Sequence, residues 1–169
     1  ARYLTTQAKD DPIEYVHQEI GFNYRLTNVQ AAMGVAQLER LGEFVDRKRA
    51  IAARYAGALE AVDGLTLMAE ASWADSSWWM YTVLVDEMCF GRDSRSLLKA
   101  LEVSAIQTRP LWQPLHCSGA HLGAFHMACP VAERLNREAL SLPCSVGLTE
   151  DDQRRVTNRL LAIARESSG

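Results

Sequence analysis

The sequence has no long hydrophobic run and no excess of positive charge. Its apolar stretches are all far shorter than the roughly 20 residues that a membrane-spanning helix needs, so no such helix is expected. The formal net charge is -3, which gives no overall positive field to attract nucleic acid or an acidic membrane surface. The first residues lack both the apolar segment of a signal peptide and an initiator Met. We therefore expect a piece of a longer chain.

Several signatures of chemistry are also missing. The four cysteines are irregularly spaced in a chain of 169 residues, which suits a reduced, cytoplasmic protein better than a disulfide framework. No serine lies in a Gly-x-Ser-x-Gly elbow, and no glycine-rich phosphate loop is present. Hydrophobic residues make up 48% and charged residues 23%, which is a normal balance for a globular domain.

A polar turn that leads into a helix is the most informative local feature. Thr27 is suited to cap the helix, and Gln30 can complete a capping box by reaching back to it. Asn23 and Arg25 then lie on a loop held by a rigid element, where polar groups often have a function. From local chemistry alone two interpretations remain open, a functional pair or a solvated arginine beside a turn-forming asparagine.

The apolar residues over 28–62 recur at a spacing of three to four, which predicts a helix ended by Asp63 and Gly64. Its length favours either one long helix that crosses between domains or two helices joined at Gly42. We accordingly expect residues 28–62 to be an interdomain helix and residues 63–169 a small α+β domain, with residues 1–27 as an arm and a turn before them; that this turn belongs to an active site is implied only by the family resemblance given below.

The segments after residue 63 read as short strands alternating with helices. The expected strands are residues 65–68, 78–85 and 103–108, with an edge strand at 139–143. The expected helices begin near Asp93 or Ser94, at Pro130, and at Thr149. The predicted fold class is α+β: a long leading helix and a short, mostly antiparallel sheet with helices packed on it.

A long proline-containing loop after residue 108 contains Arg109, Trp112 and His116. Arginine binds phosphate with a forked pair of hydrogen bonds, tryptophan stacks on flat rings, and histidine exchanges hydrogen bonds. The set suits an anionic ligand with a flat ring. The alternative from spacing alone is a stiff connection in which the tryptophan caps the core and the histidine faces solvent.

Cysteine and histidine also gather between residues 117 and 129. Cys117, His121, His126 and Cys129 are zinc-ligand types, but their spacing matches no standard zinc finger. Scattered core cysteines and surface histidines explain the pattern better, and we predict no metal site here.

Three stretches together resemble one enzyme family. Residues 21–40 read GFNYRLTNVQAAMGVAQLER, residues 107–116 read QTRPLWQPLH, and residues 140–152 read LSLPCSVGLTEDD. In order and spacing they resemble the DegT/DnrJ/EryC1/StrS sugar aminotransferases over nearly the whole chain, and among them the perosamine-synthase-like enzymes of 4-amino sugars.

The resemblance implies a fold type I aminotransferase, of which this chain is the C-terminal portion. Such enzymes are homodimers that use pyridoxal phosphate to move an amino group from glutamate to a nucleotide-linked 4-keto-6-deoxy sugar. It implies that Asn23 binds the cofactor phosphate of the other subunit. It also implies that the nucleotide sugar is contacted by Tyr24, Arg25, Arg109, Trp112 and His116.

The family's lysine that binds the cofactor as an imine has no counterpart here. The chain has only Lys9, Lys48 and Lys99, and none lies in the required Asn-Lys context before a glycine-rich strand. We therefore expect a fragment that is inactive by itself and that holds no cofactor by that route. The alternative is a non-catalytic, dimerising domain derived from such an enzyme.

Overall fold

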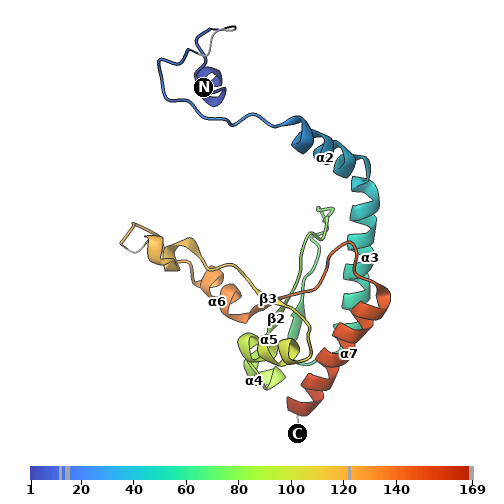
Figure 1. Ribbon diagram of the computed structural model, residues 1–169. Helices are drawn as coiled ribbons and strands as arrows, with labels where there is room; N and C mark the ends of the chain where they lie inside the picture. The colour runs from blue at the N-terminus through green and yellow to red at the C-terminus, as the bar shows by residue number, and fades with distance from the viewer. Residues whose placement is uncertain (12, 14–15, 122, 168–169) are drawn as a thin grey trace. The chain divides into compact units, whose positions relative to one another are not determined.

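The computed structural model describes residues 1–11, 13, 16–121 and 123–167 (Figure 1). The chain divides into two compact units, residues 1–42 and residues 43–169. Each unit is described by itself below. None of the described helices is long and apolar enough to cross a membrane.

The first unit begins with α1 (Arg2–Thr5) and contains α2 (Asn28–Glu39). Between them an isolated antiparallel bridge joins Thr6 to Asn23. The segments that contain Gln7 and Gly21 approach each other so closely here that a Cβ on Gly21 would lie 2.3 Å from the carbonyl carbon of Gln7. Only glycine allows this approach, which explains the glycine that opens the Gly-Phe-Asn-Tyr-Arg turn.

The second unit is built on a four-stranded antiparallel sheet in the order β1-β2-β4-β3. Its strands are β1 (Leu65–Leu67), β2 (Tyr81–Val85), β3 (Arg109–Pro110) and β4 (Ala139–Leu142). Leu140 pairs with Val83 on one side and with Pro110 on the other. All four residues of β4 are buried, so β4 is an inner strand and not the predicted edge strand. Its uninterrupted burial explains why its sequence shows no alternation.

The residues expected to form a strand at 103–108 do not form one. Val103 ends α5, a turn follows in which Ala105 has a φ of 55°, and the strand pairing begins only at Arg109. The apolar run Val-Ser-Ala-Ile had favoured a strand, but only Ile106 of these four is buried as part of the hydrophobic core.

The helices of the second unit pack with this sheet. They are α3 (Leu41–Leu59), α4 (Glu87–Phe90), α5 (Ser94–Val103), α6 (Pro130–Glu138) and α7 (Glu150–Ser167), with short 3-10 turns η1 (Leu115–Cys117) and η2 (Gly119–His121) in the long loop. Figure 1 shows α3 and α7 side by side. Their contact is specific, because Gln153 is buried and donates from Nε2 to the Ile51 carbonyl at 2.7 Å.

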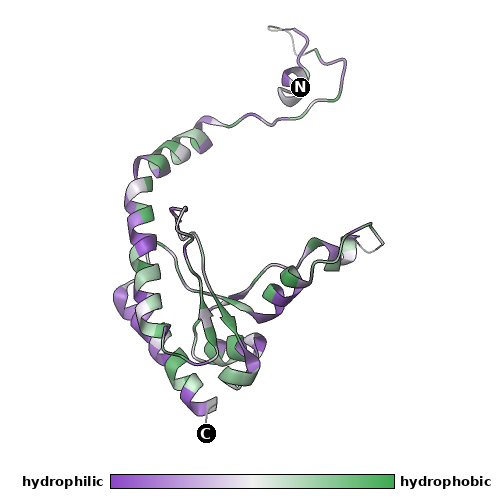
Figure 2. Cartoon of the chain, turned by 180° about the vertical axis from the view of Figure 1, so that it is seen from behind, coloured by the Kyte–Doolittle hydropathy of each residue, from purple (hydrophilic) through white to green (hydrophobic). Residues whose placement is uncertain are grey.

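The hydrophobic core lies between the sheet and these helices. Buried side chains recur along α3 at the spacing of one helix face: Ile51, Ala52, Tyr55 and Leu59. They pack in one cluster with residues of the sheet, α5 and α7, among them Val83, Leu97, Leu140 and Leu160. In Figure 2 green, hydrophobic residues are prominent in the sheet, whereas the helices carry both green and purple residues. Each such side chain contributes roughly 1.5–3 kcal/mol by leaving water.

The predicted α+β class, with a short antiparallel sheet and helices packed on it, is confirmed. The leading helical stretch is two helices, of which α2 ends at the C-cap Arg40 and α3 ends at Leu59. Residues 28–62 therefore contain two helices and not one long helix. The break between them lies at Arg40, two residues before Gly42. The predicted capping box at the start of α2 is present.

Candidate functional site

The turn of the first unit holds three of the predicted site residues, Asn23, Tyr24 and Arg25. All three are exposed, and Tyr24 is 73% exposed. The backbone N–H of Tyr24 donates to Thr5, and its ring stacks on Phe22 with centroids 5.4 Å apart. The turn is thus held by backbone pairing while its side chains remain available to a ligand.

The capping box makes the junction between this turn and α2 rigid. The Gln30 backbone N–H donates to Thr27 Oγ1 at 3.3 Å, and the Thr27 backbone N–H donates to Gln30 Oε1 at 3.0 Å. Two donors of the helix start are satisfied reciprocally, which fixes where the helix begins. Arg25 therefore lies two residues before Thr27, the N-cap at which α2 begins.

A hydrogen bond between two side chains orders the segment that precedes the turn in this unit. The Tyr3 hydroxyl donates to Asp10 Oδ1 at 2.7 Å, and Asp10 Oδ2 accepts from the Gln18 backbone N–H at 2.8 Å. The bond to Asp10 raises the pKa of Tyr3 to about 12, and the same bond lowers the pKa of Asp10. Both groups are exposed, so this pair orders the chain and contributes little to stability.

The second group of predicted residues lies on β3 and in the loop that follows it. Arg109 is exposed at the edge of the sheet, and Trp112 is 66% exposed. Trp112 does not cap the core. It stacks on Trp79 with centroids 5.8 Å apart and an interplanar angle of 13°. The pair presents aromatic surface to solvent beside a guanidinium group.

Arg109 and Trp112 line one cavity of about 640 Å³, together with Met80, Arg95, Leu111, Gln113, Asn136 and the ring of Pro110. This volume is in the range of sites for small organic ligands. The lining combines two arginines with an indole ring. It therefore suits a ligand that has both negative charge and a flat ring.

Two residues that the sequence did not single out hold this loop in place. Asn136 donates from Nδ2 to the carbonyls of Leu111 at 2.7 Å and Trp112 at 3.0 Å. Arg95 in turn donates from Nη2 to the Asn136 carbonyl at 2.9 Å. An asparagine inside an amphipathic helix gives no signal by itself, because its partners lie 24 and 25 residues earlier in the chain.

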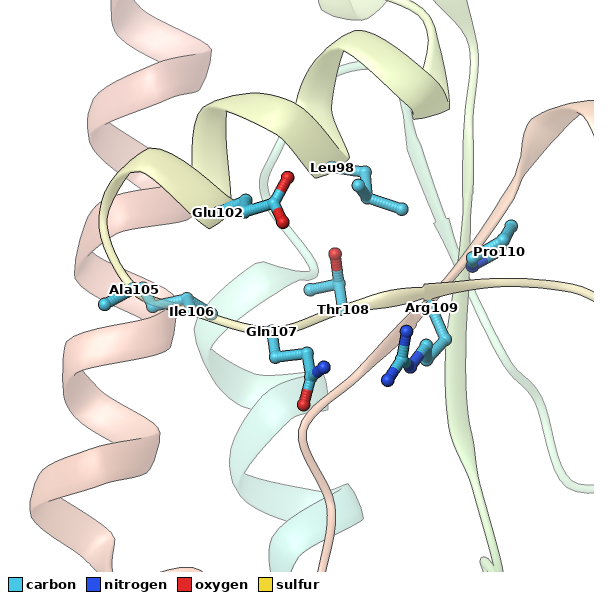
Figure 3. A pocket seen from close by; sticks show the side chains of 8 residues that line it. All are labelled: Leu98, Glu102, Ala105, Ile106, Gln107, Thr108, Arg109 and Pro110. Atoms are coloured by element: carbon cyan, nitrogen blue, oxygen red, sulfur yellow. The ribbon is translucent and has the colours of Figure 1, made fainter.

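Arg109 also borders a second cavity, of about 280 Å³, which Leu98 and Glu102 of α5 line as well. Figure 3 shows Thr108 pointing toward Leu98 and Glu102 of α5, while Gln107 and Arg109 point the opposite way. Thr108 is 5% exposed, and its hydroxyl has no hydrogen-bond partner among the described residues. A buried hydroxyl without a partner is costly, so this cavity is suited to hold water or a polar ligand group.

His116 lies apart from the cavity at Trp112. It is half-buried in η1, donates a hydrogen bond from Nε2 to the Glu133 carboxylate of α6 at 2.9 Å, and stacks on His126 with ring centroids 5.1 Å apart. The predicted site residues of the loop therefore form two groups. Arg109 and Trp112 line the same cavity, whereas His116 contacts Glu133 of α6.

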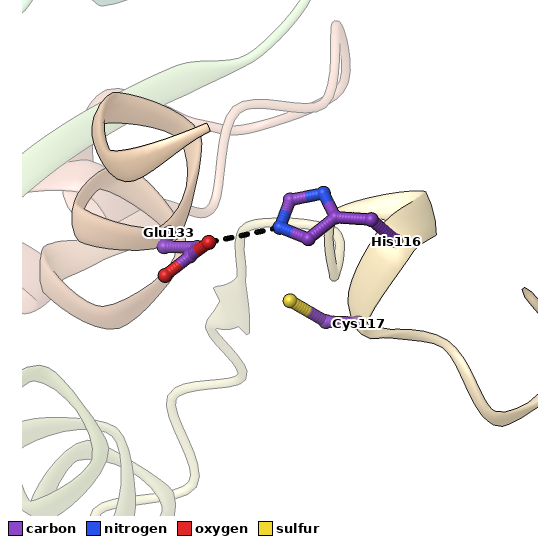
Figure 4. Close-up of side chains that lie close together, drawn as sticks. All are labelled: His116, Cys117 and Glu133. Atoms are coloured by element: carbon purple, nitrogen blue, oxygen red, sulfur yellow. Dashed lines mark hydrogen bonds and ion pairs between the residues drawn. The ribbon is translucent and has the colours of Figure 1, made fainter. Parts of the chain in front are cut away.

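The Cys/His set considered from the sequence does not come together as one cluster. Among the described residues, the group whose ligand atoms lie within 4.8 Å of one another is His116, Cys117 and Glu133 (Figure 4). Glu133 carries no signal of this in the sequence, because acidic residues are common on helix surfaces. The sequence carries no signal that α6 packs against η1.

The fit of the chain's own residues to pyridoxal phosphate is partial. Asn23 offers an exposed amide to a phosphate. Lys48 donates to the carbonyls of Trp79 at 2.7 Å and Cys144 at 2.5 Å, so it ties α3 to two loops. Lys99 is exposed on α5, and no lysine lines the two cavities at Arg109. No step through the cofactor is therefore assigned to these residues.

The profile described as the DegT/DnrJ/EryC1/StrS aminotransferase family matches residues 1–161. The chain belongs to this family.

Individual relatives agree with this assignment. Over 96% of its length the chain is 38% identical to EpsN of Bacillus subtilis, and over 92% it is 35% identical to a GDP-perosamine synthase of Caulobacter vibrioides. The crystal structure of the aminotransferase TlmJ from Streptoalloteichus hindustanus matches 99% of the chain with a TM-score of 0.86 and 28% identity. The chain spans 42% of each of these two relatives and 44% of TlmJ, which is less than half their length.

Proposed function

We propose that this chain is the C-terminal part of a pyridoxal phosphate-dependent aminotransferase. The complete enzyme transfers an amino group from glutamate to a nucleotide-linked 4-keto-6-deoxy sugar. The proposal is supported by the family, by the similarity to GDP-perosamine synthases and by the similarity to a transaminase of a dTDP-linked amino sugar from Streptomyces venezuelae. We further propose that the enzyme is a cytoplasmic homodimer.

The observation that carries the proposal is the cavity shared by Arg109 and Trp112. A nucleotide sugar has a flat base and a diphosphate. The exposed indole pair of Trp79 and Trp112 offers a stacking surface, and Arg109 and Arg95 offer charge-assisted donors beside it. Arg95 already donates to the Asn136 carbonyl, which leaves Arg109 as the main partner for phosphate.

The cofactor supplies the electron sink for transamination in the complete enzyme. The residues of this chain supply positioning. Asn23 donates its amide to the cofactor phosphate, while Tyr24 and Arg25 contact the nucleotide sugar from the same turn. Arg109 and Trp112 bind the sugar nucleotide from the small domain, and His116 orients their loop through its contact with α6. Such positioning acts by lowering the entropy cost of bringing the two reactants together.

Binding of nucleotides to the chain tests this assignment. GDP and dTDP are titrated against the chain while tryptophan fluorescence is recorded. We expect saturable quenching that is lost in Trp112→Ala and weakened in Arg109→Ala. Trp73→Ala is the matched control because Trp73 is 88% exposed and lines neither cavity at Arg109. Equal quenching in Trp112→Ala and in the unchanged chain would contradict the assignment.

Activity tests the second part of the proposal. We expect the 169-residue chain to show no transamination of a nucleotide-linked keto sugar with glutamate. Reduction with borohydride in the presence of pyridoxal phosphate should label no single lysine stoichiometrically. Turnover together with one labelled lysine would show that the chain holds a complete active site.

The alternative function is a non-catalytic, dimerising domain. Exposed apolar residues along α2 favour this alternative: Val29, Met33, Val35 and Leu38 are each more than half exposed. Figure 2 shows hydrophobic residues along this helix. Sedimentation velocity over a wide concentration range separates the alternatives, since a chain that stays monomeric at high concentration is not a dimerising domain.

A further inference from the structure

Three side chains of different chemistry meet where the long loop returns to α6. His116 and Cys117 come from η1, and Glu133 comes from the first turn of α6 (Figure 4). One ligand atom from each lies within 4.8 Å of the other two. His116 Nε2 and Glu133 Oε1 are 2.9 Å apart.

The donor set is one that zinc prefers. A thiolate, an imidazole nitrogen and a carboxylate oxygen bind Zn²⁺ at about 2.3, 2.0–2.1 and 2.0–2.2 Å, and three protein ligands with one water make a common tetrahedral site. Hard cations such as Mg²⁺ favour oxygen ligands alone, so the thiol and the imidazole argue against them.

The geometry needs only small movements to close around an ion. In a tetrahedron with these bond lengths, neighbouring ligand atoms are about 3.4–3.6 Å apart. The His116 and Glu133 atoms must therefore separate by about half an ångström, and Cys117 Sγ must approach them by up to about 1.2 Å. Cys117 and Glu133 are exposed, so these are changes of side-chain rotamer that disturb no packed core.

The surroundings leave these ligands available. Arg134 and Arg137, the cations beside Glu133 on α6, both form ion pairs with Glu138. The side chain of His116 is 12% exposed, and its ring is held between Glu133 and the stacked ring of His126. A ring held in this way already presents Nε2 to the cluster, which lowers the entropy cost of binding an ion.

We propose that His116, Cys117 and Glu133 bind one Zn²⁺ ion, with water as the fourth ligand. The ion links η1 to α6. It replaces the direct contact of His116 with Glu133, and the bound thiol of Cys117 gives up its proton. The open fourth position leaves room for exchange of the water.

Titration with Co²⁺ tests the site, because a cobalt ion bound by a thiolate shows a ligand-to-metal charge-transfer band in the near ultraviolet. We expect one Co²⁺ per chain, the charge-transfer band, and visible bands of a tetrahedral ion, all displaced by one equivalent of Zn²⁺. Cys117→Ser should lose the charge-transfer band. Glu133→Gln should keep the band and weaken Zn²⁺ binding by at least about tenfold.

Two control variants remove the same residue types from outside the cluster. Cys89→Ser removes an exposed cysteine of α4, and His121→Gln removes an exposed histidine of η2. Both should bind Co²⁺ and Zn²⁺ as the unchanged chain does. Thermal melts without metal should agree for all variants, because Cys117 and Glu133 are exposed.

Two results would overturn the proposal. One is a charge-transfer band that persists in Cys117→Ser or disappears in Cys89→Ser. The other is the absence of saturable Co²⁺ binding to the folded, reduced chain. Neither result bears on nucleotide binding, which depends on the cavity at Trp112 and is measured without metal.

Discussion

Removing the Tyr55 hydroxyl tests how α3 is attached to the sheet. The Tyr55 ring is fully buried, stacks on Tyr81 with centroids 5.1 Å apart, and donates from its hydroxyl to the Pro143 carbonyl at 2.8 Å. Tyr55→Phe keeps the ring and the stacking but leaves that carbonyl without this donor. The expected loss is about 1–1.5 kcal/mol of unfolding free energy, which lowers Tm by about 2–6 °C in a chain of this size.

The same substitution has a pH dependence with a defined sign. Burial raises the pKa of Tyr55 above its ordinary value of 10.0, with smaller contributions from Cys144 and Tyr81. Above pH 10 the unfolded chain ionises this phenol while the folded chain keeps it protonated. Unfolding then releases a proton, so stability falls by up to about 1.4 kcal/mol per pH unit. The stability contribution of the protonated phenol is complete below pH 10 and is lost as pH rises.

Tyr55→Phe lacks this ionisation, and the difference between the two proteins must therefore shrink with pH. A neutral-pH loss of about 1–1.5 kcal/mol is cancelled roughly one unit above the unfolded pKa, near pH 11. Burial also raises the pKa of Tyr81, but Tyr81 is present in both proteins and does not affect the difference.

Urea unfolding followed by tryptophan fluorescence at pH 7, 9, 10 and 11 measures the difference. Tyr24→Phe is the control, because Tyr24 is 73% exposed and should give no difference at any pH. A Tyr55→Phe difference that stays constant up to pH 11 would refute the reasoning. It would mean that the hydroxyl is not a buried donor in the folded protein.

Three further substitutions have expected outcomes. Gly64→Ala should cost at least about 2–3 kcal/mol by urea unfolding, because Gly64 has a φ of 78° and a Cβ there would lie 2.3 Å from Phe90 N. Thr27→Ala should destabilise the first turn of α2 by about 1 kcal/mol, which is measured as faster amide exchange there, while amide exchange in the second unit stays unchanged. Asn136→Ala should increase both amide exchange at residues 111–113 and acrylamide quenching of tryptophan, because two carbonyls lose their donor; unchanged quenching would contradict this.

Local chemistry accounts for what could be predicted about the helices. Thr27 with Gln30, Asp93 before α5, and Pro130 at the first position of α6 all mark helix starts in the structure. These signals act between residues three or four apart, so they do not depend on the rest of the fold.

The strands were harder to predict because pairing partners are distant. Residues 139–143 looked like an edge strand, yet β4 pairs with β2 and β3 on its two sides. Residues 103–108 looked like a strand, yet the pairing begins only at Arg109. An apolar run shows that a segment is buried, but not how many neighbours it has.

The residues of the candidate site also divide into those that sequence motifs predicted and those that only the structure revealed. Asn23, Tyr24, Arg25, Arg109, Trp112 and His116 were selected from motifs, and their roles stay predictions. Asn136, Arg95 and Glu133 were not selected, since each acts through partners far away in the sequence. The structure also separates His116 from the cavity that Arg109 and Trp112 share.

The family, the α+β class and the helix starts could be read from the amino-acid sequence, because they depend on residue types at short, fixed spacings. Three further features emerge only from the folded chain: β4 is an inner strand, Trp112 stacks on Trp79, and His116 and Cys117 lie beside Glu133. Each of these depends on packing between segments separated by at least 16 residues, where loop closure and core burial, rather than local propensity, select the contact.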